Sequence, residues 1–284
     1  MLRVGRIPYI NCYPVYGGID RGVVPLDAEL VDGVPTALNR RIADGTLDVS
    51  VVSAVEYARD ADRLLLLPDL GITCDGPVRS VLLFSDRPAE ALGGQRVVVS
   101  RSSMTSVALL ELLFEHVWRC RPEFVAGDAE VSDLGRIERD ADRPARLVIG
   151  DAALLLRAHP RLGGGEGPAP FAHVYDLGEE WQRWTGQPFV FAVWVAQRTT
   201  PVAESLRVHA SLIESRDWGL RHLDALAAQA QQVTGLPLSV CAEYFAGLDY
   251  RLSYPHLAGL TEFFRRLVAA GRVPDGRLTF LPAA

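Results

Sequence analysis

The chain has 284 residues, a net charge of −6 and a hydrophobic content of 49%, a composition typical of a globular protein large enough for two lobes. Its 29 basic residues are scattered singly or in pairs, which disfavours a nucleic-acid partner. No apolar run approaches the roughly 18 residues of a membrane span, and the N-terminus lacks the features of a secretory leader. We therefore predict a cytoplasmic protein with no membrane or nucleic-acid partner.

The first 86 residues alternate between strand-like and helix-like segments. Strand patterns at 2–7, 26–31 and 47–53 are separated by helical patterns that begin at Pro14 and Pro35, and Gly45 ends the second helix. Residues 77–85 form a longer strand pattern. Such alternation predicts βαβ units and a mainly parallel sheet.

A second α/β segment follows, with strand patterns at 96–100, 122–127 and 146–150 and a helix over roughly 104–117. A short polar helix is expected between 127 and 146, and the Gly-rich tract 161–170 predicts a flexible surface loop. Residues 187–198 give another long strand, and helices dominate from 203 to 271. We predict an α/β fold of two lobes, whose mixed, mainly parallel sheets are joined by two crossover strands. The lobes are residues 1–86 with 198–284, and residues 87–197, with the ligand cleft between them.

Ligands of open α/β sheets collect at the carboxyl ends of strands, next to helix N-termini. Asn11 follows the first strand pattern and precedes Pro14, which is placed like the first residue of a helix. Asn11 is therefore a candidate ligand contact, although an asparagine that only completes the turn is at least as common. Near residue 80, Ser80 is the small polar candidate among apolar neighbours, whereas Arg79 is expected to point to the opposite face.

Four hydroxyl side chains gather where the strand 96–100 passes into the next helix. Free amides and hydroxyls at a helix start suit a carboxylate or phosphate, although ordinary N-capping needs only one of these side chains. Asp151 also stands at a helix start, where it could face the cleft or serve as a cap. The four hydroxyl candidates are Ser102, Ser103, Thr105 and Ser106.

Several catalytic patterns are missing from the sequence. All six histidines lie outside the three strand ends described above, and no Ser-His-Asp order, HExxH motif or phosphate-binding loop is present. The four cysteines lie far apart without zinc-site spacing, so we expect free thiols and no metal. Catalysis by a histidine at the switch point is disfavoured.

Six motifs in order resemble chorismate dehydratase of the futalosine route to menaquinone. The resemblance runs in order from residue 3 to about 196, and its motifs read GRIPYINCYPVYGGI, LNRRIADGTLDVSVVSAVEYAR, LLLLPDLGITCDGPVRSVLLFS, SRSSMTSVALLELL, VIGDAALL and DLGEEWQRWTGQPFVFAVW. The resemblance implies the two-lobed fold of type II periplasmic binding proteins. It also implies conversion of chorismate to 3-[(1-carboxyvinyl)oxy]benzoate and water, without a cofactor.

The resemblance carries the family's active-site asparagine to Asn11 and its active-site serine to Ser80, and it implies that the hydroxyl-rich helix start holds a substrate carboxylate. Two alternatives remain. The related 1,4-dihydroxy-6-naphthoate synthase has the same fold, but its catalytic histidine would fall where this chain has Gly150 and Asp151. The second alternative is a small-anion binding protein without catalysis. The oligomeric state is left open.

Overall fold

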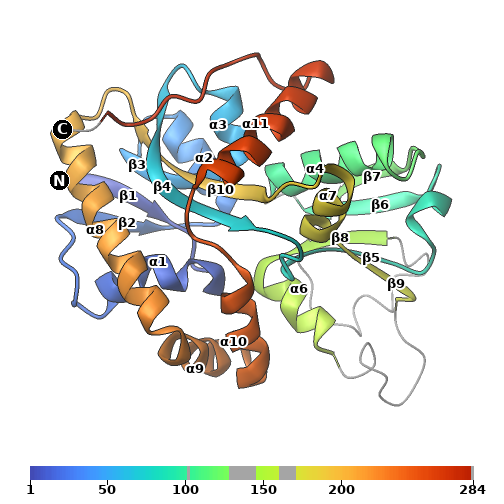
Figure 1. Cartoon of the computed structure of the whole chain (residues 1–284), viewed down its shortest axis with the longest axis horizontal. Helices are drawn as coiled ribbons and strands as arrows, with labels where there is room; N and C mark the ends of the chain where they lie inside the picture. Colours follow the sequence, from blue (N-terminus) through green and yellow to red (C-terminus); the bar gives the residue numbers. More distant parts are fainter. Residues whose placement is uncertain (101–102, 128–144, 160–170, 283–284) are drawn as a thin grey trace.

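The computed structural model of the chain describes residues 1–100, 103–127, 145–159 and 171–282. The described strands form two five-stranded sheets that lie at opposite ends of an elongated molecule (Figure 1). Both chain termini lie at the end that holds the first sheet. The predicted α/β architecture with two lobes is confirmed.

The first sheet has the strand order β2-β1-β3-β10-β4. Strand β1 pairs in parallel with β2 and β3, whereas β10 runs antiparallel to both β3 and β4. All five positions of β3 are buried, as expected of a central strand covered on both faces. The strands are β1 (Leu2–Arg6), β2 (Ala28–Asp32), β3 (Val49–Ser53), β4 (Leu64–Cys74) and β10 (Phe189–Gln197).

The second sheet repeats this plan with the order β7-β6-β8-β5-β9. Strand β6 pairs in parallel with β7 and β8, and β5 is antiparallel to β8 and β9. Each sheet is therefore evenly mixed and not mainly parallel, because each contains one strand that arrives from the other lobe. The strands are β5 (Val81–Ser85), β6 (Arg96–Ser100), β7 (Glu123–Gly127), β8 (Ala145–Ile149) and β9 (His173–Asp176).

Two connections join the sheets. The chain leaves the first sheet after β4 and enters the second at β5, and it returns between β9 and β10. The predicted lobe limits had assigned residues 81–85 to the first lobe and residues 189–197 to the second, but strand pairing puts each in the opposite sheet. An apolar run identifies a strand without revealing its partners, and this is why the limits shift. We propose lobes of 1–76 with 187–282 and of 77–186.

Helices cover the faces of both sheets. In the first lobe these are α1 (Tyr13–Asp20), α2 (Pro35–Ala43), α3 (Ala54–Arg59), α8 (Val202–Arg221), α9 (Leu223–Thr234), α10 (Leu238–Gly247) and α11 (Tyr254–Ala269). In the second lobe they are α4 (Met104–His116), α6 (Gly150–Arg157) and α7 (Leu177–Thr185). Short 3-10 turns lie at η1 (Ile10–Cys12) and η2 (Ala89–Ala91).

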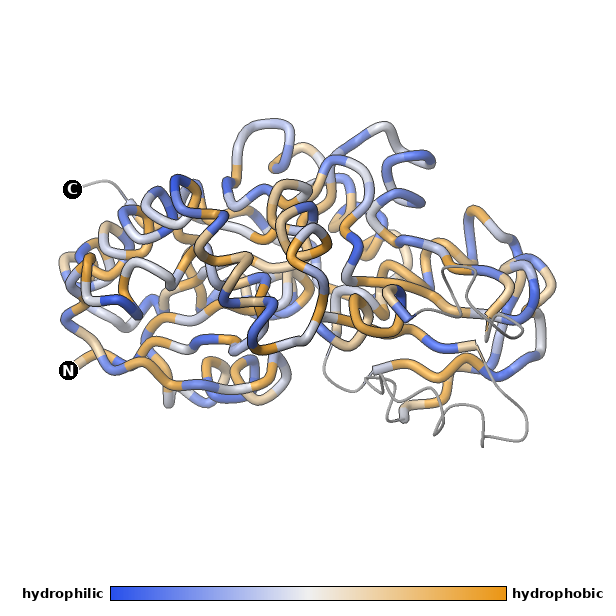
Figure 2. Tube along the Cα trace, turned by 90° about the horizontal axis from the view of Figure 1, so that it is seen from below, coloured by the Kyte–Doolittle hydropathy of each residue, from blue (hydrophilic) through white to orange (hydrophobic). Residues whose placement is uncertain are grey.

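The expected helices at 14, 35–44, 104–117 and 203–271 are confirmed. Figure 2 shows hydrophobic segments in both lobes, with hydrophilic segments mostly toward the outside. None of the described helices has both the length and the apolar character that crossing a membrane requires. The predicted polar helix between 127 and 146 and the loop 161–170 lie outside the described residues.

Candidate functional site

A small cavity of about 70 Å³ lies between the two sheets and collects predicted residues from both lobes. Asn11, Ser80, Ser103 and Ser106 line it, together with Ser53 at the end of β3. Larger hollows of about 540 Å³ and 460 Å³ contain none of these residues. The sequence therefore brings its strand-end candidates to one place, although they are up to 95 positions apart.

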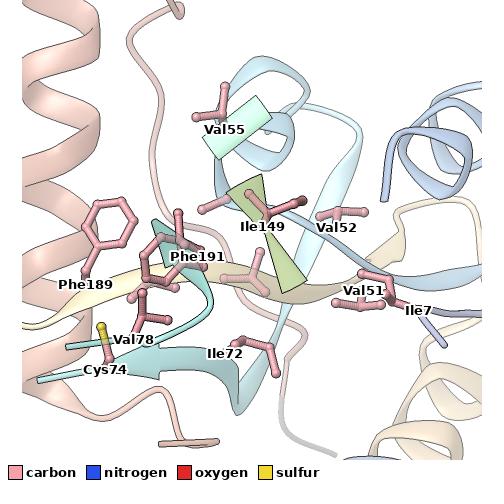
Figure 3. Close-up of a cluster of buried hydrophobic side chains, with 14 of the residues drawn as sticks. Ile7, Val51, Val52, Val55, Ile72, Cys74, Val78, Ile149, Phe189 and Phe191 are labelled. Carbon is pink, nitrogen blue, oxygen red and sulfur yellow. The ribbon is translucent and has the colours of Figure 1, made fainter. Parts of the chain in front are cut away.

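The remaining wall of the cavity is mostly apolar. Figure 3 shows Ile149, from the second sheet, within a cluster that includes Ile72 and Phe191 of the first sheet. None of the described lining residues is charged, and none is a histidine. An anionic ligand here would depend on hydroxyls and free helix amides. The apolar members of the lining are Ile7, Tyr9, Pro35, Ile72, Val81, Ile149, Gly150, Phe191 and Ala192.

Asn11 belongs to the turn η1, directly after β1 and before α1. Pro14 occupies the first turn of α1, where its missing N–H has no cost. The absence of a side chain at Gly219 of α8 lets the backbone of Pro14 approach closely, which fixes the turn behind the cavity. The buried Oδ1 of Asn11 has no hydrogen-bond partner among the described residues.

An unpartnered buried carbonyl oxygen costs about 1–3 kcal/mol. Such a group is uncommon in native proteins unless a ligand completes it. Since Asn11 Oδ1 lies at the cavity, the group that would satisfy it is a hydrogen-bond donor such as a hydroxyl. This observation favours the ligand-binding interpretation of Asn11 over the simple turn.

Ser80 lies in the connection between β4 and β5 and is 3% exposed. Its Oγ accepts a hydrogen bond of 2.8 Å from the hydroxyl of Tyr244, and its carbonyl accepts one of 2.8 Å from Gly150 N–H. Arg79 instead forms an ion pair with Glu243, at 2.9 Å. Ser80 therefore lines the cavity between the sheets, whereas Arg79 is not among its described lining residues.

The carboxylate of Asp176 holds the backbone that leads to Ser80. It accepts hydrogen bonds from the amides of Val78 at 3.0 Å and Arg79 at 2.6 Å, and it also caps α7. Arg79 has a φ of 62°, a left-handed conformation that is strained for a residue with a side chain. Asp176 stabilises this conformation, and sequence reasoning missed it because its helix-cap signal gives no hint of a second role.

The hydroxyl side chains at the start of α4 have two roles: some cap the helix, and one contacts the other lobe. Ser103 is the N-cap: its Oγ accepts from Ser106 N–H at 3.3 Å and donates to Ser106 Oγ at 2.7 Å. Thr105 Oγ1 instead accepts from the backbone N–H of Val55, at the start of α3, at 3.2 Å. Thr105 therefore links the lobes and is not among the described residues that line the cavity. Ser102 lies outside the described residues.

Asp151 also connects the lobes. Its Oδ1 accepts a hydrogen bond of 3.3 Å from Ile10 N–H, one residue before Asn11. Burial raises the pKa of this carboxyl to about 6, and the Ile10 hydrogen bond opposes the rise only in part. Asp151 is not among the described residues that line the cavity. Its hydrogen bond to Ile10 instead supports the turn that carries Asn11.

Comparisons with known proteins show the family of the chain. A family described as menaquinone biosynthesis matches residues 2–269. The chain is 32% identical over 275 residues to the chorismate dehydratase of Thermus thermophilus. This alignment covers 92% of this chain and 95% of the relative.

Two solved structures share the fold. A protein from Archaeoglobus fulgidus superimposes with a TM-score of 0.76 at 19% identity, covering 96% of this chain and 98% of the other. The periplasmic aliphatic sulphonate binding protein of Escherichia coli gives 0.63 at 14% identity, covering 98% and 94%. The architecture is that of the periplasmic binding proteins, and by its sequence the chain belongs to the menaquinone biosynthesis family and to the family of chorismate dehydratase.

Proposed function

We propose that this protein is a chorismate dehydratase that converts chorismate to 3-[(1-carboxyvinyl)oxy]benzoate and water. The observation that carries the proposal is the match to the Thermus enzyme along almost the whole length of both chains. The cavity supports it, because Asn11 and Ser80 meet there. We also propose a cytoplasmic location and chorismate as the small-molecule partner, with no nucleic-acid partner.

The reaction removes the proton from C3 and the hydroxyl from C4 of chorismate. The electrons of the C3–H bond form the new ring double bond, and the hydroxyl leaves and takes up a proton to become water. Aromatisation drives the elimination thermodynamically, so the enzyme must solve a kinetic problem. No external oxidant, reductant or cofactor is needed for this balance.

We propose that a carboxylate of the substrate itself removes the C3 proton, since the described cavity lining offers no side-chain base. Holding that carboxylate beside C3 makes the proton transfer intramolecular, and such positioning can contribute about 7 kcal/mol or more. The hydroxyls of Ser103 and Ser106 and the first turn of α4 suit a carboxylate without a cation. We assign to Ser102 the same role.

Asn11 and Ser80 are proposed to act on the departing hydroxyl. The unpartnered Oδ1 of Asn11 can accept a hydrogen bond from the C4 hydroxyl and so orient it for departure. We propose that Thr105 and Asp151, which bridge the lobes, stabilise the closed cleft and do not touch the substrate directly. A cavity of about 70 Å³ is smaller than the roughly 300 Å³ of typical ligand sites, so admission of chorismate requires the lobes to separate.

The test is turnover of chorismate by the purified protein, followed by loss of substrate and appearance of the aromatic product. Replacing Asn11 with alanine should lower kcat by roughly a hundredfold while changing chorismate binding much less. A Ser205→Ala variant is the control, because it removes another buried and unpartnered polar group that does not line the cavity.

The alternatives give different results. Tight binding of chorismate without turnover by the wild type would favour a small-anion binding protein. Neither binding nor turnover would favour the related 1,4-dihydroxy-6-naphthoate synthase. Unchanged turnover in Asn11→Ala would remove Asn11 from the mechanism while leaving the activity itself in place.

A further inference from the structure

Ser80 is a buried polar side chain of the cavity, and it accepts a hydrogen bond from a helix in a distant part of the chain. Two successive residues of α10 reach the connection between the sheets: Glu243 pairs with Arg79 at 2.9 Å, and Tyr244 donates to Ser80 Oγ at 2.8 Å. Helix α10 lies in the first lobe beside the start of β5 (Figure 1). Its contacts fix both the backbone and the side chain that approach the substrate.

We propose that Tyr244 is a positioning residue that sets the direction of the Ser80 hydroxyl, so that Ser80 acts on the substrate as a hydrogen-bond donor. This inference rests on the proposed function and assigns a role to a residue outside the cavity wall.

The direction of the hydrogen bond between Tyr244 and Ser80 follows from the partners that each hydroxyl has. Tyr244 is 1% exposed, and Ser80 Oγ is the one partner found for its hydroxyl among the described residues. If the serine donated to the phenol, the phenol hydrogen would be buried without an acceptor, which is unfavourable. Burial also raises the pKa of Tyr244, so the phenol keeps its proton and remains a donor.

The hydrogen of the Ser80 hydroxyl then has a weak acceptor within the described part of the protein. Its protein acceptor is the carbonyl of Val78, at 3.5 Å, the outer limit for a hydrogen bond. A substrate oxygen in the cavity can therefore take over this hydrogen at little cost. Because Ser80 accepts from Tyr244, its oxygen is also less basic, which disfavours Ser80 as the group that removes the C3 proton.

Tyr250 provides a matched control. It is also a fully buried tyrosine of the first lobe, but its hydroxyl has no hydrogen-bond partner among the described residues. Tyr244→Phe and Tyr250→Phe remove the same atom from similarly buried surroundings. Only the first removes a hydrogen bond to Ser80.

The experiment measures kcat, KM for chorismate and the melting temperature in wild type, Tyr244→Phe, Tyr250→Phe, Ser80→Ala and the Tyr244→Phe/Ser80→Ala double variant. We expect Tyr244→Phe to lower kcat by up to about tenfold, with KM within about twofold. The double variant should be no slower than Ser80→Ala alone, because Tyr244 acts only through Ser80. Tyr250→Phe should keep wild-type kcat.

Wild-type kcat in Tyr244→Phe would overturn the inference and leave the dehydratase function standing. Rate losses that multiply in the double variant would also overturn it, since they would mean that Tyr244 acts independently of Ser80. Equal losses in Tyr244→Phe and Tyr250→Phe, with equal falls in melting temperature, would indicate a merely structural role. A wild-type protein that does not consume chorismate would remove the proposed function and this inference with it.

Discussion

At the residue scale, Asp151 is a half-buried acidic side chain at the junction of the lobes, and among the described residues no basic side chain is found to donate a hydrogen bond to it. One backbone amide, that of Ile10, donates to it at 3.3 Å. A single long hydrogen bond cannot offset the loss of water around a carboxylate. This imbalance is why the pKa of Asp151 rises to about 6 from the ordinary 3.8.

The raised pKa predicts how stability depends on pH. Between about pH 4 and 6 the folded protein holds a proton on Asp151 that the unfolded chain has released, so stability falls as the pH rises through this window. Asp151→Asn keeps an acceptor for Ile10 without the charge. Thermal unfolding measures the difference in melting temperature between the variant and the wild type. We expect this difference to shift in favour of the variant as the pH rises from 4 to 6.5, and to stay constant above that pH.

Asp32 is the control, because its ion pair with Arg6 lowers its pKa. Its carboxylate contributes stability above the ordinary pKa, and that contribution disappears as the pH falls through the lowered value. Asp32→Asn should therefore show a nearly constant deficit between pH 5 and 7.5. A difference between wild type and Asp151→Asn that does not vary with pH would contradict the assignment.

The residues that sequence reasoning found are identified by local patterns, whereas those that it missed depend on contacts with residues distant in the sequence. Asn11, Ser103 and Ser106 follow strand ends, and Ser80 is a small polar residue within an apolar run; local patterns identify both kinds of position. Tyr244 acquires its role by contact with a residue 164 positions away. No local pattern distinguishes it from any other tyrosine on a buried helix face.

At the scale of elements, periodicity predicted the helices well and the sheet partners poorly. Strands β3 and β10 are evident as apolar runs. Strand β9 was missed because it has four residues, all half-buried, and β5 is its one partner among the described strands. The two antiparallel pairings of β10 could not be foreseen. They depend on which lobe the chain re-enters, and that is decided by tertiary packing.

The junction of β8 and α6 depends on glycine. Gly150 has a φ of 63°, donates its N–H to the Ser80 carbonyl, and would bring an added Cβ within 3.1 Å of the Tyr9 ring. Gly150→Ala should therefore cost about 1–3 kcal/mol through backbone strain, with more from the crowded ring. Chemical denaturation measures the loss of stability. The N–H of residue 150 remains in the variant, but the strained backbone should shift it away from the Ser80 carbonyl, so kcat should fall as well.

Gly45→Ala separates the two effects. Gly45 has a φ of 69°, but an added Cβ would meet nothing within 4 Å. It should show the backbone strain alone, with unchanged kcat. Equal behaviour of the two variants would contradict a specific role for Gly150 in supporting Ser80.

At the scale of the whole molecule, the contacts between lobes hold the small cavity closed. Thr105 accepts from Val55, Asp151 accepts from Ile10, and both bonds lie close to the cavity. Farther out, Arg272, which follows α11 in the first lobe, reaches α4 of the second. It contacts Glu111 at 3.1 Å, Glu115 at 3.4 Å and the Ala108 carbonyl at 3.4 Å.

Because α4 carries Ser103 and Ser106 at its start, opening the cleft must break the contacts of Arg272. The side chain of Arg272 is 27% exposed, so its ion pairs are partly screened and contribute about 1 kcal/mol or less. A free energy of that size changes the ratio of closed to open molecules by up to about fivefold. The contact can bias closure without preventing chorismate from entering.

We therefore expect Arg272→Gln to increase the radius of gyration of the free protein in small-angle scattering and to raise KM for chorismate by up to about fivefold, with kcat at saturation unchanged. Raising the salt concentration should shift the wild type in the same direction and affect the variant less, since salt screens the lost ion pairs. Arg265→Gln is the control, because Arg265 pairs with Glu262 within α11 and does not cross between the lobes. If the two variants scatter alike and share one KM, Arg272 does not hold the lobes together, and closure depends on other contacts between them, such as the hydrogen bonds of Thr105 and Asp151 and the apolar cluster around Ile149.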